Sequence, residues 1–243
     1  VVGGAWSLVE LFKPMIQGIK ASIDALKISN NTKNVPLEEQ DFPINYVGYS
    51  LLVLLIPVFL LYLDILNDIN ISILLTLVMM VFGFLFSSVA AYMAGIVGSS
   101  NNPISGVTIA TILFSSFLLL LLGKDSIAGA SAAIMIGAVV CCAAAIGGDN
   151  LQDLKTGNIL GATPWKQQVM QIIGTLSSAL VLGLVLDILH TAYTIGSPTL
   201  SAPQATLMKS VAEGVFNGYL PWARGGRGCN MGIIIITVDL RQK

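Results

Sequence analysis

Long apolar runs alternate with short polar segments along most of this chain. Five of the runs approach or exceed the roughly 20 residues that a helix needs to cross the hydrocarbon core of a bilayer. They are residues 46–63, 71–97, 107–122, 126–146 and 169–190. The pattern predicts an all-α fold, a polytopic integral membrane bundle, located in the cell membrane as a multi-pass protein.

The charge-free segment 99–106, SSNNPISG, separates two of these runs and leaves two structures open. It is either a plain turn or a backbone break at membrane depth, which is tolerated only where it lines a cavity or is buried in protein. The next run, 107–122, gives about 24 Å of helix, short of the roughly 30 Å core. That length slightly favours the break, which would place Asn102 on a substrate or proton path.

Small residues recur at every fourth position in two of the runs. This spacing lets the backbones of membrane helices approach closely. One stripe is Gly83, Ser87, Ala91, Gly95 and Ser99, and the other is Gly129, Ala133, Gly137, Cys141 and Ala145. We therefore expect both helices to lie inside the bundle and assign them a helix-packing role.

Composition supports a membrane protein and excludes other classes. The chain is 55% hydrophobic and 10% charged, whereas soluble domains carry about a quarter charged residues. Its mean hydropathy is +0.83. A net charge of −1 excludes nucleic acid as a partner. The three cysteines have neither disulfide-framework nor metal-ligand spacing, so we expect no metal and no cofactor.

Lysine usage predicts the orientation in the membrane. The loop before residue 46 carries four lysines and the 147–168 segment carries two, while the turns at 64–70 and 123–125 carry none and one. With the five spans above, the two lysine-richer segments fall on the same side. The positive-inside rule places that side in the cytoplasm. A re-entrant 99–106 segment would remove this parity argument.

The segment 147–168, GGDNLQDLKTGNILGATPWKQQ, interrupts the apolar pattern with charged and amide side chains. It predicts a short separate helix over 150–156, with Asp149 as the capping residue, Lys155 in the last turn and Gly157 as the stop. Thr163 and Pro164 then predict the start of the next helix.

Asp153 has no such structural role in that prediction. It lies mid-helix on the same face as Asp149, and Lys155, two residues away, does not face it. We therefore name Asp153, with Asp149, Lys155 and Asn102, as candidates for the substrate or proton path. The competing interpretation is a water-exposed cytoplasmic turn. His190, Asp187 and Glu213 are weaker candidates for proton coupling.

Four stretches carry a resemblance to a known family. They are VGGAWSLVELFKPMIQGI at the start, NNPISGVTIAT, the 147–168 segment and EGVFNGYLPW. Over roughly residues 1–222 the chain resembles prokaryotic members of the oligopeptide transporter family. The resemblance implies a proton-coupled importer of small peptides or metal–chelate complexes, built from internal repeats. Its partners would be the substrate, protons, the lipid bilayer and the remaining helices of a larger parent transporter, of which this chain would be a fragment.

Residues 223–243 depart from that pattern. All three arginines of the chain, Arg224, Arg227 and Arg241, lie there, while every earlier cation is lysine. We expect an atypical tail, frameshifted or otherwise foreign, the alternative being a basic loop. Two other function classes stay open: a structural membrane subunit without its own transport path, and an intramembrane aspartyl protease, whose motif Gly147-Gly148-Asp149 matches only in part. No other enzyme signature is present in the sequence, so we expect no enzyme.

Overall fold

The computed structural model of the chain describes residues 16–17, 20, 36–37, 40–124 and 126–218. In order, the longer elements are α2 (Ile44–Leu66), α3 (Ile69–Val97), the short 3₁₀ helix η2 (Ser99–Asn101), α4 (Ile104–Leu121), α5 (Ser126–Ile159), α6 (Pro164–Tyr193) and α7 (Pro203–Phe216). Five of these, α2 to α6, are long and apolar enough to cross a membrane. The predicted all-helical, multi-pass architecture is confirmed, and each predicted run falls within or almost within one helix. The 223–243 tail and the lysines before residue 46, except Lys20, lie outside the described residues.

The turns at one end of the bundle are joined by a charged contact. Asp68 precedes α3, and its carboxylate accepts hydrogen bonds from the backbone N–H groups of Asn70 (3.1 Å) and Ile71 (3.3 Å). The same carboxylate pairs with Lys124 Nζ at 3.2 Å. The α2–α3 turn and the α4–α5 turn therefore lie side by side at this end.

The structure corrects one element, because α5 continues without a break through residues 147–159. The predicted separate helix over 150–156 is wrong, and Asp149 lies within α5 instead of capping a helix. Gly147 and Gly148 do not end α5. They let it approach α3, since a Cβ on Gly147 would lie 2.5 Å from Ser87 Oγ. Helix packing at this contact offsets the low helix propensity of glycine, which costs about 1 kcal/mol per residue.

The actual end of α5 is set by Gly161 and not by Gly157. Gly161 has a positive φ of 73°, which glycine adopts without a steric cost. The Ala162 N–H donates to the Gly157 carbonyl (2.8 Å) and the Gly161 N–H to the Asn158 carbonyl (3.3 Å). These two bonds make a Schellman motif. Pro164 then begins α6 with Thr163 at the N-cap position, as predicted, although the Thr163 side chain makes no capping hydrogen bond.

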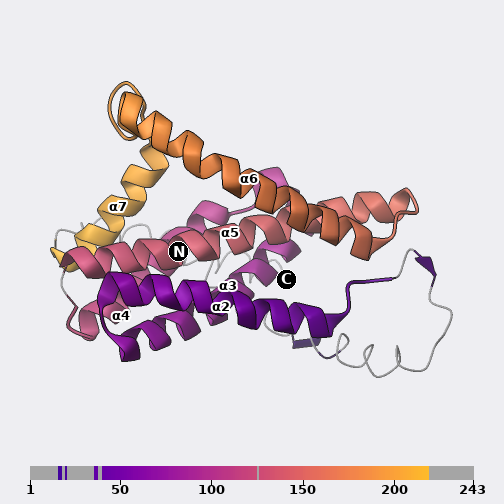
Figure 1. The fold of residues 1–243 in the computed structure, drawn as a ribbon, viewed down its shortest axis with the longest axis horizontal. Coiled ribbons are helices and arrows are strands. Elements are labelled where there is room, and N and C mark those ends of the chain that lie inside the picture. The colour runs from indigo at the N-terminus through magenta and orange to yellow at the C-terminus, as the bar shows by residue number, and fades with distance from the viewer. Residues whose placement is uncertain (1–15, 18–19, 21–35, 38–39, 125, 219–243) are drawn as a thin grey trace, which may run out of the picture.

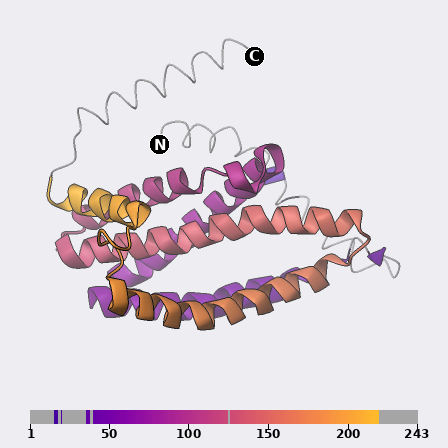
Figure 2. The ribbon, with the colours of Figure 1, turned by 90° about the horizontal axis from the view of Figure 1, so that it is seen from above.

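Helix α5 is the centre of the bundle. It packs mainly along α3 and α4, and in Figure 2 it lies between α4 and α6. Helix α3 runs in the same direction as α5, since Ser87 faces Gly147 and Gly98 faces Gln152. The buried core where these helices and α2 meet includes Tyr62, Leu75, Phe86, Leu119, Ile136 and Val140.

Several residues of the small-residue stripes lie at these helix contacts, although a Cβ on Gly83 would meet nothing within 4 Å. On α5, a Cβ on Gly129 would meet the Phe216 ring of α7, and one on Gly137 would clash with Ile112 of α4. Ala133 is fully buried beside them. On α3, Gly83 is buried and Gly95 faces Leu151. Ser87 and Ala91 are half-buried on the same helix.

Helix α6 differs from the others because none of its residues is buried. It contacts α5 near their shared turn and then diverges from it, and α7 returns steeply toward α4 and the first half of α5 (Figure 1). The divergence leaves a wedge between α5 and α6 that is closed at the turn end.

Candidate functional site: a polar cleft between α5 and α6

The wedge between α5 and α6 contains a cleft of about 430 Å³. Polar side chains and small or apolar ones both line it. The lining residues are Ile146, Asp149, Asn150, Asp153, Gln171, Gly174, Thr175, Ser178, Ala179 and Leu182. The surface of the cleft is mainly apolar, and the side chains of Asp149 and Asp153 bring two carboxylates to it.

Helical periodicity explains why these side chains meet. On α5, Asp149 and Asp153 are four residues apart and therefore share a face. On α6, Gln171, Thr175 and Ser178 follow the same periodicity in a run that is otherwise apolar. The Schellman turn at Gly161 folds α6 back so that these two faces oppose each other.

One hydrogen bond joins the two helices inside the cleft. Gln171 Nε2 donates to Asp153 Oδ2 at 2.9 Å. Thr175 uses its hydroxyl proton within α6, donating to the Gln171 carbonyl at 2.8 Å. The Asp153 carboxylate thus keeps one oxygen for another donor, while Asp149 has no hydrogen-bond partner among the described residues. Both aspartates are exposed to the cleft or to solvent.

Asn150 adds an acceptor that is buried but not used. Its Oδ1 atom is shielded from solvent and has no hydrogen-bond partner among the described residues. An unpaired buried acceptor costs about 1–3 kcal/mol, and such atoms in native structures commonly mark a binding role or a bound water. Asn150 was not a candidate from the sequence, and neither were Gln171, Thr175 and Ser178. Their spacing in an apolar run was the signal that could have identified them.

Two sequence candidates lie outside the cleft. Lys155 is exposed on α5 and does not line the cavity. Asn102 is on the other side of α5, where its Nδ2 donates to the Ala90 carbonyl at 3.2 Å and lies 2.6 Å from where a Cβ on Gly148 would be. The candidates therefore divide into Asp149 and Asp153 within the cleft, and Asn102 behind it.

The break that contains Asn102 is folded back into the bundle. Gly98, with φ +83°, ends α3, and Ser99 Oγ donates to Gln152 Oε1 of α5 at 2.9 Å. The Asn102 side chain bonds to the carbonyl of Ala90, which lies seven residues before the end of α3 at Val97. The segment that follows α3 therefore folds back along this helix by about 10 Å. Helix α4 therefore starts inside the bundle and not at the tip of α3.

The weaker candidates have other contacts. The N–H of Ile195 donates to His190 Nδ1 at 3.3 Å, so His190 closes the end of α6. Glu213 is 3.7 Å from Lys209 on α7. Asp187 is exposed on α6, away from the residues that line the cleft.

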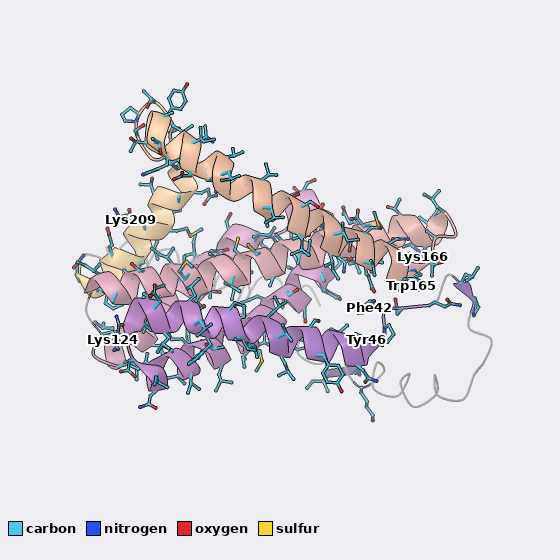
Figure 3. The ribbon with its side chains drawn as sticks, in the orientation of Figure 1. Phe42, Tyr46, Lys124, Trp165, Lys166 and Lys209 are labelled. Carbon is cyan, nitrogen blue, oxygen red and sulfur yellow. The ribbon has the colours of Figure 1, made fainter. Side chains whose placement is uncertain are left out.

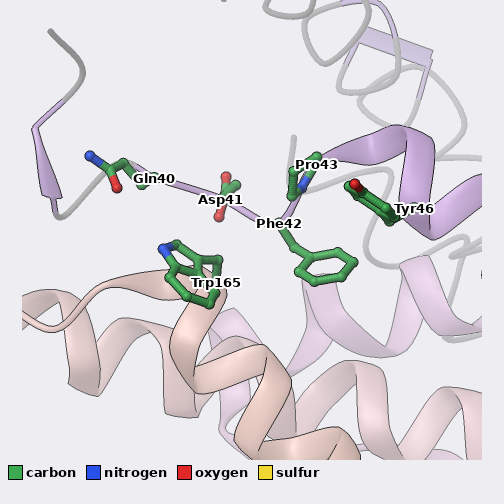
Figure 4. Close-up of a pocket in the computed structure, with 6 residues that line it drawn as sticks. All are labelled: Gln40, Asp41, Phe42, Pro43, Tyr46 and Trp165. Carbon is green, nitrogen blue, oxygen red and sulfur yellow. The ribbon is translucent and has the colours of Figure 1, made fainter.

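Aromatic side chains gather near the closed end of the cleft (Figure 3). A second cavity of about 560 Å³ is lined by Gln40, Asp41, Phe42, Pro43, Tyr46 and Trp165 (Figure 4). The backbone N–H of Trp165 donates to the Gln40 carbonyl (3.1 Å), and the backbone N–H of Phe42 donates to Gln168 Oε1 (3.3 Å). Tyr and Trp at helix ends are typical anchors in the membrane interface. Phe42, Tyr46, Trp165 and Lys166 gather at this end, and Lys124 lies at the other (Figure 3).

The cleft extends from this interface into the apolar part of the helices. Gln171 and Leu182 are eleven residues apart on α6, which corresponds to about 16 Å along the helix. Both residues line the cavity. The cleft therefore extends along α6 for a length of roughly half the 30 Å thickness of a hydrocarbon core.

Comparison with known proteins identifies the family. The family described as "OPT oligopeptide transporter protein" matches residues 1–243. The chain belongs to the oligopeptide transporter family. The match includes residues 223–243, beyond the 1–222 range in which the motifs above show the resemblance.

Two curated relatives show the same similarity. A protein of Haemophilus influenzae described as "Putative oligopeptide transporter" is 33% identical over 264 residues, covering 98% of this chain and 42% of the relative. A Saccharomyces cerevisiae protein of the same description is 27% identical over 139 residues, covering 57% of this chain and 19% of the relative. The chain thus spans less than half the length of these oligopeptide-transporter relatives. No solved structure matches the chain.

Proposed function

We propose that this chain forms part of a transporter that imports small peptides with a proton gradient, and that the α5–α6 cleft lies on the path of substrate or protons. The observation that carries the proposal is Asp153 in the cleft, bonded to Gln171 of the facing helix at 2.9 Å. A carboxylate among membrane helices is costly unless it is paired or used in function. Family membership and the descriptions of both relatives support peptides as the substrate.

A purely structural role for the cleft accounts for less of the geometry. It explains the Asp153–Gln171 pair, but it leaves Asp149 without a partner among the described residues and Asn150 Oδ1 buried and unpaired. Asp149 is the other titratable group that lines the cleft, and the facing side chains of α6, Gln171 and Thr175, do not ionise. A proton gained by one aspartate would therefore change the charge of the whole cleft.

The test is the Asp153→Asn variant of the full-length protein in proteoliposomes. Uptake of a labelled tripeptide, driven by an inward proton gradient, should fall about tenfold or more, which is the effect of losing one charged contact of about 1.5 kcal/mol. Exchange of peptide across the membrane without a gradient should persist, since the amide keeps the bond to Gln171. Asp64→Asn, an exposed carboxylate near the end of α2 that does not line the cleft, is the matched control and should transport normally. Normal gradient-driven uptake by Asp153→Asn from pH 5 to 8 would contradict the proposal.

A further inference from the structure

We propose that the cavity between residues 40–43 and the start of α6 binds the headgroup of a zwitterionic phospholipid, whose ammonium group lies against the aromatic rings and the carboxylate that line it (Figure 4). The proposal concerns a lipid and not the transported substrate, so it does not depend on the role of the α5–α6 cleft. It follows from the place of the cavity, the chemistry of its lining and the access to that lining.

The cavity lies where two candidate membrane spans begin. These spans are Asn45–Leu66 of α2 and Pro164–Tyr193 of α6, and Tyr46 and Trp165 line the cavity from their first turns. Tyrosine and tryptophan at the ends of membrane helices typically lie at the level of the lipid headgroups. A phospholipid headgroup is therefore the molecule that this cavity meets in a bilayer.

The lining suits an organic cation. It contains the rings of Phe42, Tyr46 and Trp165, and among the described residues that line it Asp41 alone carries a charge. In Figure 4 the Phe42 ring points toward α6 and the Trp165 ring points toward residues 40–43. Aromatic faces attract cations, and quaternary ammonium groups are commonly recognised by several rings together. The negative charge of Asp41 adds to this attraction.

A ligand can reach both the carboxylate and the rings. Asp41 is exposed, and the ion pairs of the described residues are those of Asp68 and Glu213, so Asp41 has no cationic partner among them. Trp165 is 37% exposed and Tyr46 is 63% exposed. The volume of about 560 Å³ lies within the roughly 300–1,000 Å³ of small-molecule sites.

An anion without a cationic group fits the cavity less well. Helix N-termini bind phosphate through free backbone N–H groups, but the backbone N–H of Trp165 already donates to the Gln40 carbonyl. Lys166 Nζ is 5.8 Å from the centroid of the Trp165 ring, but Lys166 does not line the cavity. It can attract the phosphate of any phospholipid, whereas the cavity itself selects the ammonium group.

A bound headgroup would support the start of α6. This helix has no buried residue, and its start is joined to residues 40–43 by the Trp165–Gln40 and Gln168–Phe42 hydrogen bonds. A lipid that contacts both sides of the cavity adds to these bonds. We therefore expect the lipid to stabilise the folded protein as well as to bind it.

The experiment titrates the purified full-length protein in detergent with phosphatidylcholine, phosphatidylethanolamine or phosphatidylglycerol, and measures binding by native mass spectrometry. The two lipids with an ammonium group should bind at least about fivefold more tightly than phosphatidylglycerol, which has the phosphate but no cation. They should also raise the melting temperature more than phosphatidylglycerol does. Equal or tighter binding of phosphatidylglycerol would overturn the proposal.

Variants assign the lipid preference to this cavity. Trp165→Leu and Asp41→Asn should each reduce the preference for phosphatidylcholine over phosphatidylglycerol by about threefold or more. Tyr92→Leu and Asp64→Asn replace exposed residues that do not line the cavity, and these matched controls should keep the preference. An unchanged preference in either cavity variant, at wild-type thermal stability without added lipid, would also overturn the proposal.

Discussion

Gly147 shows how a single residue decides the course of a helix here. Its missing side chain lets the α5 backbone approach Ser87, where a Cβ would lie 2.5 Å from the side-chain oxygen and 3.0 Å from the backbone oxygen. The backbone atom cannot rotate away. The sequence alone suggested a helix end at this Gly-Gly pair, because the propensity of glycine is visible in the sequence and its packing partner, 60 residues earlier, is not.

The Gly147→Ala variant should therefore destabilise the protein by about 1–3 kcal/mol, the usual cost of overfilling a packed contact. Thermal unfolding of the full-length protein in detergent measures the change. Gly183→Ala on α6 is the control, since a Cβ there meets nothing within 4 Å. It should be neutral or stabilising by up to about 1 kcal/mol, because alanine favours a helix more than glycine does. Equal effects of the two substitutions would show that Gly147 is not a packing contact.

Only the two aspartates of the candidate site could be predicted at this scale. The shared face of Asp149 and Asp153 follows from their spacing of four residues, and it holds although the predicted helix boundaries and the capping role of Asp149 were wrong. The contribution of Asn150, Gln171 and Thr175 depends on how α6 folds back on α5. That geometry comes from the turn at Gly161, which the sequence analysis did not identify as the stop.

At the scale of elements, the helices themselves were predictable because membrane-spanning length and apolarity impose strong limits on the sequence. The starts of α3 and α6 follow local signals as well, namely Asp68 before α3 and Pro164 as the first residue of α6. The packing order was less predictable. Helix α3 lies along α5 instead of pairing mainly with its neighbour α4, and no local signal specifies that choice.

The pH dependence of stability tests the ion pair between Asp68 and Lys124, which joins the α2–α3 turn to the α4–α5 turn. The backbone N–H of Ile71 and the side chain of Lys124 hold the pKa of the Asp68 carboxyl below its usual value. A lowered pKa stabilises the folded state above the unfolded-state pKa, near about 4, and this contribution is lost as pH falls through the folded-state pKa. Asp68→Asn keeps an N-cap side chain but loses the ion pair with Lys124.

The melting temperature of Asp68→Asn should therefore be lower than that of the wild type at pH 7 and about equally lower at pH 5, with the gap closing below about pH 4. Asp64→Asn, which replaces an exposed carboxylate next to the same turn, should show no such gap. A gap that stays constant from pH 7 to pH 3 would mean that the charge of Asp68 does not stabilise the turn.

At the scale of the whole molecule, the described structure has two distinct ends. The contacts of Trp165 with Gln40 define one end, and the Asp68–Lys124 pair defines the other. This arrangement fits the alternation of loops from which the lysine count predicts a cytoplasmic side. The orientation itself stays a prediction.

Cysteine labelling tests that orientation. In a background with Cys141, Cys142 and Cys229 replaced, Lys155→Cys should react with an impermeant reagent from the cytoplasmic side and Asn70→Cys from the opposite side. Both positions are exposed. Exchanged labelling would reverse the orientation, and labelling of both from one side would show that α3 and α5 do not cross the membrane as full spans. Lys27, in the lysine-rich loop, lies outside the described residues.

The parallel packing of α3 on α5 also sets an order of events during synthesis. Helix α3 leaves the ribosome before α4 and α5, so its contact surface around Ser87 and Ala90 has no partner until Gly147 and Gly148 have been made. At about 5–20 residues per second, that delay of roughly 60 residues lasts several seconds. During this time α3 and α4 must be held at the insertion site or in lipid without their final neighbour. A ribosome-stalled chain that ends before residue 147 should therefore leave α3 accessible to crosslinking by the insertion machinery, and a chain extended past α5 should release it.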